Sequence, residues 1–388
     1  MDVSGFKRPS GRLIRNARRG YYSFIPPGLP VRFEKDDEFI DLLARASQKL
    51  GELNGLGRAL DETLGNVTRR LIIPYLRNEA VLSSRIEGTL STLQEVMENE
   101  IGIAPLDEDS RGSMREVMNY VIAQDAGMDM IRHGREINVT FVKRLHALLL
   151  KGVRGEKAVP GELRALQNYI SQPGQRIDSA TFVPPPPEMV ERLLASLFAY
   201  MDSSREPVLV KLGMMHYQFE AIHPFLDGNG RIGRLLMILY LIRQHALEVP
   251  LLYMSEYFER NRMEYYSLLL EVSRNSAYPQ WMKFFLNGVI TQADAIIRKT
   301  NMLLAYHDGL VKKIKEGSSS AKAYELFLML FSNPITVIPR AADRLGLSYP
   351  AAKNAVEDLV RLGVLKQEGR GKKAKRFVAG RILEIFRS

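Results

Sequence analysis

Residues 223–234, HPFLDGNGRIGR, combine the side chains and glycines that a phosphate-binding site needs. Gly228 and Gly230 can adopt positive φ, so that successive backbone amides point inward and form an anion-binding nest. A helix that begins near Arg231 adds its N-terminal amides and the positive end of its dipole. Arg231 and Arg234 are three residues apart, so both guanidinium groups can reach one set of phosphate oxygens. The pattern predicts a site for two or more phosphate groups.

Three further residues of this stretch predict the chemistry at that site. Asp227, at the edge of the nest, is suited to bind Mg²⁺, which prefers hard oxygen ligands and bridges phosphates. His223 precedes the nest, and a neutral imidazole can take a proton from an incoming hydroxyl. Asn229 is expected to hold the loop or to reach a phosphate oxygen. The set predicts attack on a phosphorus atom, with positioning and charge neutralisation doing most of the catalysis.

The neighbouring histidine permits a different metal site. His216, Glu220 and His223 have the spacing i, i+4 and i+7, and they could share a helix face as zinc ligands. The HExxH pattern is absent, and His223 is better used as a base. We therefore expect His216 to be a hydrogen-bonded core residue and keep zinc as the alternative.

Helical patterns on both sides of the stretch must position it, and they predict a mainly α fold. The run 36–60 has apolar residues at helical spacing and acidic residues at its start, where the helix dipole favours them. A second helical run, 66–97, is expected to break at Pro74 and near Gly88. Further amphipathic helices are expected over residues 114–131, 140–150, 187–203, 206–223, 230–247, 257–274 and 278–316.

Two segments depart from the helical pattern. Residues 168–190 contain a Pro-Gly turn, then β-branched and aromatic residues, then four prolines that bar a helix until Glu188. We expect a small β-hairpin followed by an extended chain. Residues 1–30, which are basic and carry aromatic residues and prolines, are expected to form an extended arm packed along the protein.

The C-terminal residues 321–388 have the pattern of a winged helix-turn-helix: three helical runs and then a hairpin with a basic tip. The helix from Tyr349 would be the recognition helix, with Lys353 and Asn354 as candidates for groove contacts. The alternative is a winged helix that serves protein contact or dimerisation. The tip would offer phosphate contacts from Arg370, Lys372, Lys373, Lys375 and Arg376.

The composition bounds the classes of protein to consider. The chain has 388 residues and no cysteine, which excludes disulfides, cysteine zinc sites and cysteine nucleophiles. Its net charge of +10 is compatible with a polyanionic partner such as a nucleotide or nucleic acid. No apolar run is long enough to cross a bilayer, and the N-terminus lacks the apolar region of a secretory signal. We expect a cytoplasmic protein.

HPFLDGNGRIGR resembles, position for position, the Fic-domain signature HPFx(D/E)GNGRxxR. The resemblance implies a protein adenylyltransferase, which transfers AMP from ATP to a side-chain hydroxyl of a target protein and releases pyrophosphate. It implies that His223 is the general base, that Asp227 binds Mg²⁺ and that Phe225 anchors the loop in the core. The phosphate-binding residues that it implies are Gly228, Asn229, Gly230, Arg231, Ile232, Gly233 and Arg234.

The same resemblance extends to substrate specificity and to target binding. The relative Doc, which transfers a phosphate, has lysine at the position of Gly230, so the intact GNGR favours AMP transfer. Residues 168–183 look like the family's flap, which holds the target as an added β-strand. Tyr266 and Asn261 are similar to adenine-side residues of the family. The flap residues expected to take part are Ile177, Asp178 and Thr181.

Residues 83–88, SSRIEG, resemble the family's inhibitory pattern (S/T)xxxE(G/N). Ser83 and Glu87 are one helical turn apart and share a face. A Glu87 carboxylate paired with Arg234 would occupy the place that the ATP γ-phosphate needs, and the α-phosphate would then be out of line for attack. The likeness implies autoinhibition by an N-terminal helix of the same chain. A second hypothesis is that Glu87 positions a water, so that the same site removes AMP from modified targets.

We therefore expect a helical Fic core with a small β-hairpin flap and a C-terminal winged helix-turn-helix domain. The expected partners are ATP and a target protein with a Tyr, Thr or Ser hydroxyl, which includes the protein itself. A homodimer and DNA contact through the C-terminal domain are kept as alternatives, as is an ATP-sensing DNA-binding regulator as the function of the whole protein. The expected divisions are 1–110 (arm and inhibitory helix), 111–300 (Fic core), 301–320 (helix end and linker) and 321–388 (winged helix-turn-helix).

Overall fold

The structure is a computed structural model that describes residues 1, 3–64, 66–89, 91–102, 108–153, 159–172, 174–316, 320–369 and 375–387. The described chain is mainly α-helical, as the sequence predicts, with two small sheets. Within these residues, no helix combines the length and the apolar character that crossing a membrane requires.

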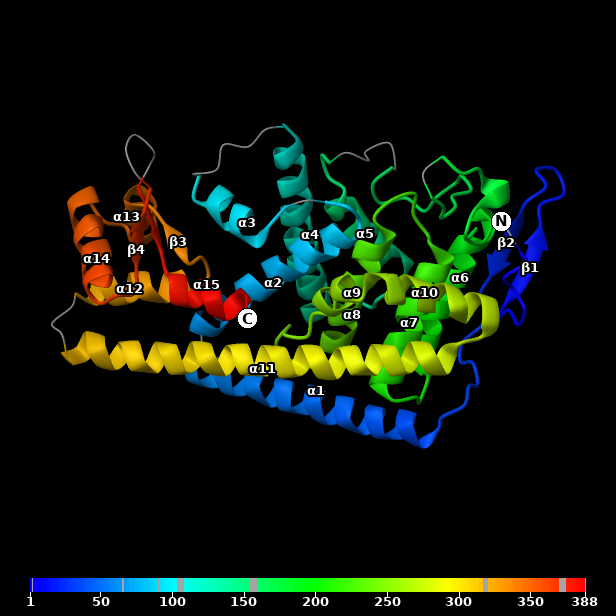
Figure 1. Cartoon of the computed structure of the whole chain (residues 1–388), viewed down its shortest axis with the longest axis horizontal. Coiled ribbons are helices and arrows are strands. Elements are labelled where there is room, and N and C mark those ends of the chain that lie inside the picture. The colour runs from blue at the N-terminus through cyan, green and yellow to red at the C-terminus, as the bar shows by residue number, and fades with distance from the viewer. Residues whose placement is uncertain are drawn as a thin grey trace.

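Helices α7 (Val208–Ile222) and α8 (Asn229–Arg243) lie in the centre of the molecule (Figure 1). Both are apolar around most of their circumference, and nearly all their residues are buried. Residues 223–228, which join the two helices, are therefore fixed at both ends by buried structure. The helices that pack around this pair are α4 (Glu108–Arg132), α5 (Val139–Leu149), α6 (Pro187–Ser203) and α10 (Arg262–Asn275).

A pair of long helices, α1 (Asp37–Leu64) and α11 (Tyr278–Glu316), runs along one side of the molecule (Figure 1). Lys49 of α1 pairs with Asp294 of α11, Nζ to Oδ1 at 3.0 Å. Lys283 of α11 pairs with Asp36 at 2.7 Å, next to the start of α1. Helix α11 leads from the helical core to the group of helices and strands formed by the C-terminal residues (Figure 1).

The predicted break at Pro74 is wrong, because helix α2 (Asn66–Ile86) continues through it. A proline inside a helix removes one backbone hydrogen bond. Helix α2 nevertheless packs against α1, α4, α8 and α9 (Ser255–Arg260), and these tertiary contacts keep it intact. The break near Gly88 is confirmed: α2 ends at Ile86, Gly88 has a φ of 102°, and α3 (Leu93–Glu100) follows.

The N-terminal arm folds back on itself, whereas the prediction was an extended arm packed along the protein. Strands β1 (Arg12–Arg15) and β2 (Tyr22–Ile25) form an antiparallel pair at one end of the molecule (Figure 1). The backbone N–H of Phe24 donates to the carbonyl of Val183 at 2.8 Å, and its ring contacts Phe182 with 5.7 Å between ring centroids. The arm therefore backs the segment expected to be the flap.

The predicted β-hairpin at this flap is also wrong in detail. In its described residues, 168–172 and 174–190, the segment contains one antiparallel bridge, between Ile170 and Phe182, and a short 3-10 helix, η2 (Ile177–Ser179). Its backbone groups are satisfied locally instead, since Ser179 N–H donates to Arg176 and Ala180 N–H donates to Ile177. Local turns take the place of the longer ladder that the Pro-Gly turn and the β-branched and aromatic residues predicted.

The chain ends in a group of helices and short strands that we call the C-terminal unit, residues 321–387. Its three-stranded antiparallel sheet has the strand order β3-β5-β4. The expected final hairpin is followed by a helix, α15, that the sequence reading missed. Arg370, Lys372 and Lys373 of the predicted basic tip lie outside the described residues. The elements are α12 (Ala321–Leu330), β3 (Ile335–Thr336), α13 (Ile338–Leu345), α14 (Tyr349–Arg361), β4 (Lys366–Glu368), β5 (Arg376–Val378) and α15 (Gly380–Arg387).

Candidate functional site

The loop between α7 and α8 begins at His223, whose backbone is left-handed with φ 50° and ψ 62°. Its Nδ1 lies 3.3 Å from the carbonyl oxygen of Glu220. A carbonyl oxygen only accepts hydrogen bonds, so Nδ1 carries the proton and Nε2 keeps its lone pair. Burial lowers the pKa of His223 to about 4, which leaves the ring neutral at pH 7. This geometry suits the predicted role of general base.

Arg164, which the sequence reading missed, holds the backbone of this loop. Its Nε donates to the carbonyl of His223 at 2.8 Å, and its Nη2 donates to the carbonyls of Ile222 at 3.3 Å and Pro185 at 2.5 Å. The arginine is buried. A left-handed backbone costs a non-glycine residue about 1–2 kcal/mol. The buried guanidinium therefore helps to fix a conformation that His223 would not favour by itself.

Asn229 holds the middle of the loop rather than pointing into solvent. Its side-chain Oδ1 accepts from the N–H of Phe225 at 2.8 Å, and its Nδ2 donates to the carbonyl of Phe225 at 2.9 Å. The buried ring of Phe225 stacks on His146 with 3.8 Å between centroids. Gly161 N–H donates to His146 Nδ1, so His146 Nε2 carries the proton and donates to the carbonyl of Asp227 at 3.1 Å.

Of the two glycines predicted to have a positive φ, only Gly228 has one; Gly230 lies within the first turn of α8, which corrects that prediction. Gly228 has a φ of 74° and precedes the first turn of α8. Gly230 faces the site directly, since a Cβ there would overlap the Glu87 carboxylate and lie 2.8 Å from Arg234 Nη1. Ile232, which the sequence reading grouped with the phosphate-binding residues, is a fully buried core residue.

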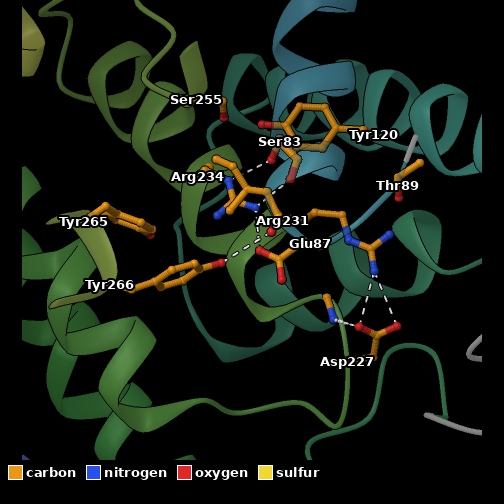
Figure 2. Close-up of polar contacts among 12 residues, drawn as sticks. Ser83, Glu87, Thr89, Tyr120, Asp227, Arg231, Arg234, Ser255, Tyr265 and Tyr266 are labelled. Atoms are coloured by element: carbon orange, nitrogen blue, oxygen red, sulfur yellow. Dashed lines mark hydrogen bonds and ion pairs between the residues drawn. The ribbon is translucent and has the colours of Figure 1, made fainter. Parts of the chain in front are cut away.

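Figure 2 shows Arg234 held by the last turn of α2. Its Nε donates to Ser83 Oγ at 2.9 Å and its Nη2 donates to the carbonyl of Ser83 at 2.8 Å. Nη2 also donates to Glu87 Oε1 at 2.7 Å, which makes a buried ion pair on the arginine side. The arginine side chain is 1% exposed, whereas the Glu87 side chain is 33% exposed. The Glu87 carboxylate is therefore the partner of this ion pair that can move away into solvent.

Electrostatics keep this pair charged. Burial by itself would raise the pKa of Glu87, but the charge and hydrogen bond of Arg234, together with the charges of Arg231 and His223, outweigh burial, and the pKa is lowered. Burial would likewise lower the pKa of Arg234, and the charge of Glu87 raises it. Tyr266 adds a hydrogen bond to the same turn, from its hydroxyl to the carbonyl of Ile86 at 3.4 Å.

The second arginine of the motif, Arg231, lies between two carboxylates. Its Nη1 donates to Glu116 Oε2 at 3.1 Å, and its Nη2 lies 3.4 Å from both oxygens of Asp227 (Figure 2). Glu116 also accepts a hydrogen bond from Thr89, two residues after Glu87. Arg231 therefore holds the edge of the site at which Asp227 stands.

The residues present fit the Mg²⁺ ion that the family resemblance implies. Asp227 is half-exposed, and its Oδ1 accepts from the N–H of Gly228 at 2.7 Å. One carboxylate at the edge of a phosphate site is sufficient, because Mg²⁺ commonly takes its other ligands from substrate phosphates and water. In the part of the chain that the structure describes, no cluster of three or more His, Cys, Asp or Glu side chains could hold a metal alone.

A cavity of about 800 Å³ lies beside the Arg234–Glu87 pair. Its volume falls in the range of small-molecule sites. Predicted residues from four parts of the chain meet in its lining: Glu87, Thr181, His223, Gly230, Arg234 and Tyr266.

Other predicted residues are not among those that line the cavity. Asn261 lies at the junction of α9 and α10, and its side-chain amide donates to the carbonyl of Tyr257 at 2.9 Å. Ile177 and Asp178 are in the 3-10 helix of the flap segment. His216 is a buried core residue, with Nε2 2.8 Å from the hydroxyl of Tyr265.

Two buried carboxyl groups lie near the site: Glu79, which the sequence did not point to, and Glu220, which the sequence suggested only as a zinc ligand. Glu79 lies on α2, four residues before Ser83, and accepts from Ser255 Oγ at 2.5 Å and Ser255 N–H at 3.1 Å. Burial raises the pKa of Glu79 to about 7. Burial also raises the pKa of Glu220 to about 8, and a Cβ at Gly233 would lie 2.5 Å from Glu220 Oε1. The spacing of Glu79 from Ser83 was the signal that could have identified it.

Two family models match the chain and together span about half of it. Residues 136–241 match the Fic/DOC family, and residues 40–129 match the Fic/DOC family N-terminal region. The first includes the loop with His223 and Arg234, and the second includes Ser83 and Glu87. The chain therefore belongs to the Fic/DOC family.

Curated proteins named as protein adenylyltransferases are similar to part of the chain. A probable protein adenylyltransferase of Aquifex aeolicus, aq_aa38, is 36% identical over 101 residues, which cover 26% of this chain and 29% of that protein. Protein adenylyltransferase Fic of Nematostella vectensis is 24% identical over 235 residues, 58% of this chain and 50% of that protein. The chain thus spans half or less of the length of these relatives.

Solved structures share the fold. A Fic family protein from Desulfovibrio desulfuricans G20 superposes with a TM-score of 0.54 at 21% identity, over 92% of this chain and 98% of that one. Fic-1 of C. elegans superposes with a TM-score of 0.53 at 19% identity, over 69% of this chain and 74% of that one. These similarities extend the family likeness to the three-dimensional arrangement of the helices.

Proposed function

We propose that this protein is an autoinhibited protein adenylyltransferase that transfers AMP from ATP to a Tyr, Thr or Ser hydroxyl of a target protein. The proposal rests above all on His223. A neutral imidazole with a free Nε2 lines the same cavity as Arg234 and the first turn of α8. Curated relatives that match the chain are named as protein adenylyltransferases, which supports the same reaction.

In the proposed reaction, His223 Nε2 takes the proton of the target hydroxyl as its oxygen attacks the α-phosphorus of ATP. The new bond joins that oxygen to the α-phosphorus, and the bond to the bridging oxygen of pyrophosphate breaks. The N-terminal amides of α8 and the guanidinium groups of Arg231 and Arg234 would stabilise the phosphate charge. Asp227 would hold Mg²⁺, which supplies further neutralisation of the phosphates.

Autoinhibition follows from the position of the Glu87 carboxylate. The carboxylate packs against Gly230 and accepts a hydrogen bond from Arg234 Nη2. In the proposed active state, a phosphate group would bind at this place. ATP with its γ-phosphate on Arg234 must therefore displace Glu87. ATP bound elsewhere would present its α-phosphorus out of line with His223. The same carboxylate is a candidate to position a water for removal of AMP from a modified target, and the protein itself is a candidate target.

The alternative function, an ATP-sensing DNA-binding regulator, depends on the C-terminal unit. Its elements fit a winged helix-turn-helix, and Lys353 and Asn354 are exposed on α14. Lys353 Nζ is engaged by Glu357 at 3.6 Å, which reduces its availability to phosphate groups. Salt-sensitive binding of a defined DNA duplex, without AMP transfer to any protein, would favour this alternative.

The proposed activity can be tested on a cell lysate. The lysate would be incubated with ATP and either the Glu87→Gly or the Glu87→Gly/His223→Ala protein, and modified peptides would be identified by mass spectrometry. We expect AMP on Tyr, Thr or Ser of target peptides with the first protein only. Equal labelling with both proteins, or none with either, would contradict the proposal.

A further inference from the structure

Helix α3 packs against the C-terminal unit, although in sequence it closely follows residues 83–88, which we call the inhibitory turn in keeping with the proposed function. Its apolar face, Leu93, Met97 and Ile101, lies in a separate small hydrophobic cluster with residues of the C-terminal unit. Those residues come from strands β3 and β5 and helix α15: Ile335, Val378 and Leu383. The placement of α3 beside β3 is visible in Figure 1.

Polar contacts fasten α3 to the same unit. Asn333 Nδ2 donates to the carbonyl of Met97 at 2.9 Å. Arg340 Nη2 donates to the carbonyl of Glu100 at 3.0 Å, which satisfies a free carbonyl at the C-terminal end of the helix. Arg376 of β5 forms an ion pair with Glu98. Apolar and polar contacts thus both connect α3 with the C-terminal unit.

The C-terminal unit also contacts α2, ahead of the inhibitory turn. Arg77 of α2 pairs with Glu100 at 2.6 Å, with both side chains largely buried, and it also donates to the carbonyl of Ser332. The ring of Tyr75 packs edge-on against Phe386 of α15, with 5.2 Å between centroids. Contacts with one unit therefore lie on both sides of Ser83 and Glu87.

We propose that the C-terminal unit controls the release of Glu87 by holding α3. This inference rests on the proposed function and names the regulation of its site. Because α2 packs against the helical core, we place the movement in the short chain that follows it, Glu87–Thr89. With α3 fastened, that chain is tethered at both ends, and the Glu87 carboxylate stays near Arg234.

The space around the turn is consistent with such a movement. Gly88, at the end of α2, has a φ of 102°, and a Cβ built there would meet no atom within 4 Å. Ligand binding to the C-terminal unit that loosens α3 would therefore favour ATP over Glu87. By linkage, ATP that has displaced Glu87 would weaken the hold on α3 to the same extent.

The Glu98–Arg376 ion pair is a part of this attachment that a single substitution can remove. Both Glu98→Gln and Arg376→Gln remove the pair. Glu98→Gln also changes the contact of Glu98 with Gln94, and Arg376→Gln also removes the contact of Arg376 with Glu368. Arg361→Gln is the matched control, because Arg361 is an exposed residue of the same unit that pairs with Asp358 on its own helix. Each change would be made in the full-length protein, with Glu87 intact and with Glu87→Gly.

With Glu87 intact, we expect Glu98→Gln and Arg376→Gln each to raise AMP transfer roughly two- to fivefold, and Arg361→Gln to leave it unchanged. In the Glu87→Gly background, none of the three should change AMP transfer. The proposal is overturned if the two variants act equally in both backgrounds, or if neither raises transfer with Glu87 intact.

Hydrogen exchange supplies a measurement that does not depend on the enzymatic activity. Both pair-breaking variants should increase amide exchange over residues 84–89 and 91–100 relative to wild type, and Arg361→Gln should not. Unchanged exchange there would overturn the proposal even if AMP transfer rose. If Glu87→Gly shows no AMP transfer at all, the proposed function has failed, and the exchange result still decides whether the C-terminal unit holds the turn.

Discussion

The Glu87 carboxylate lies against the Cα of Gly230, so close that no side chain fits between them. Gly230 belongs to the first turn of α8, where free amides and the helix dipole favour an anion. The Glu87 carboxylate thus occupies a surface that suits a phosphate group. A glycine is required at this position by both proposed states of the site.

Gly230→Ala is expected to destabilise the protein mainly through Glu87. The added methyl overlaps the carboxylate and approaches Arg234, so the free energy of unfolding should fall by about 1–3 kcal/mol. In the Glu87→Gly background the same change should cost clearly less, since one of the two crowded groups is gone. Urea unfolding of the four proteins measures this coupling. Additive effects would show that the carboxylate does not lie where the structure has it.

Ser83→Ala should give partial release of the inhibitory turn. It removes the acceptor of Arg234 Nε but leaves the Ser83 carbonyl and Glu87 in place. One such hydrogen bond contributes about 1 kcal/mol, so AMP transfer should rise roughly fivefold. Labelled ATP measures the rate, with Glu87→Gly as the upper reference. A rise equal to that of Glu87→Gly would mean that Ser83 is the main restraint and that the ion pair is secondary.

Arg164→Lys should lower kcat by roughly 10- to 100-fold in the Glu87→Gly background, because His223 loses its fixed backbone. The KM for ATP should change much less, since Arg164 is not among the cavity-lining residues. Arg192→Lys, at an exposed position of α6, is the control. A rise in KM with unchanged kcat would indicate that Arg164 serves ATP binding instead.

Glu220 should make stability fall as the pH rises. Burial raises its pKa from 4.5 to about 8, so the folded protein binds a proton that the unfolded chain has lost. Its contribution is complete below pH 4.5 and is lost as the pH rises towards and through 8. Each such proton gives a slope of at most about 1.4 kcal/mol per pH unit. Unfolding measured from pH 5 to 8 should show a shallower decline for Glu220→Gln than for wild type, and identical slopes would refute the buried neutral carboxyl.

Much of the site could be read from the sequence because its residues are local. His223, Gly228, Gly230 and Arg234 lie in one loop and one helical turn, where spacing fixes their relative positions. The pairing of Glu87 with Arg234 followed from the family resemblance, since 147 residues separate them and no local rule joins them.

Contacts that depend on tertiary packing could not be predicted from the sequence. Arg164 and His146 support the loop from distant segments, and no pattern around them indicates that role. Helix α2 passes through Pro74 because its neighbours hold it, which outweighs the local preference. The flap segment lost most of its expected strand pairing to local turns. The attachment of α3 to the C-terminal unit links segments more than two hundred residues apart.

The most direct test of the account compares AMP transfer from labelled ATP by three forms of the full-length protein. Wild type should be weakly active, Glu87→Gly strongly active, and Glu87→Gly/His223→Ala inactive. This order requires both an inhibitory carboxylate and a base in one site. Equal transfer by wild type and Glu87→Gly, or undiminished transfer after His223→Ala, would contradict it.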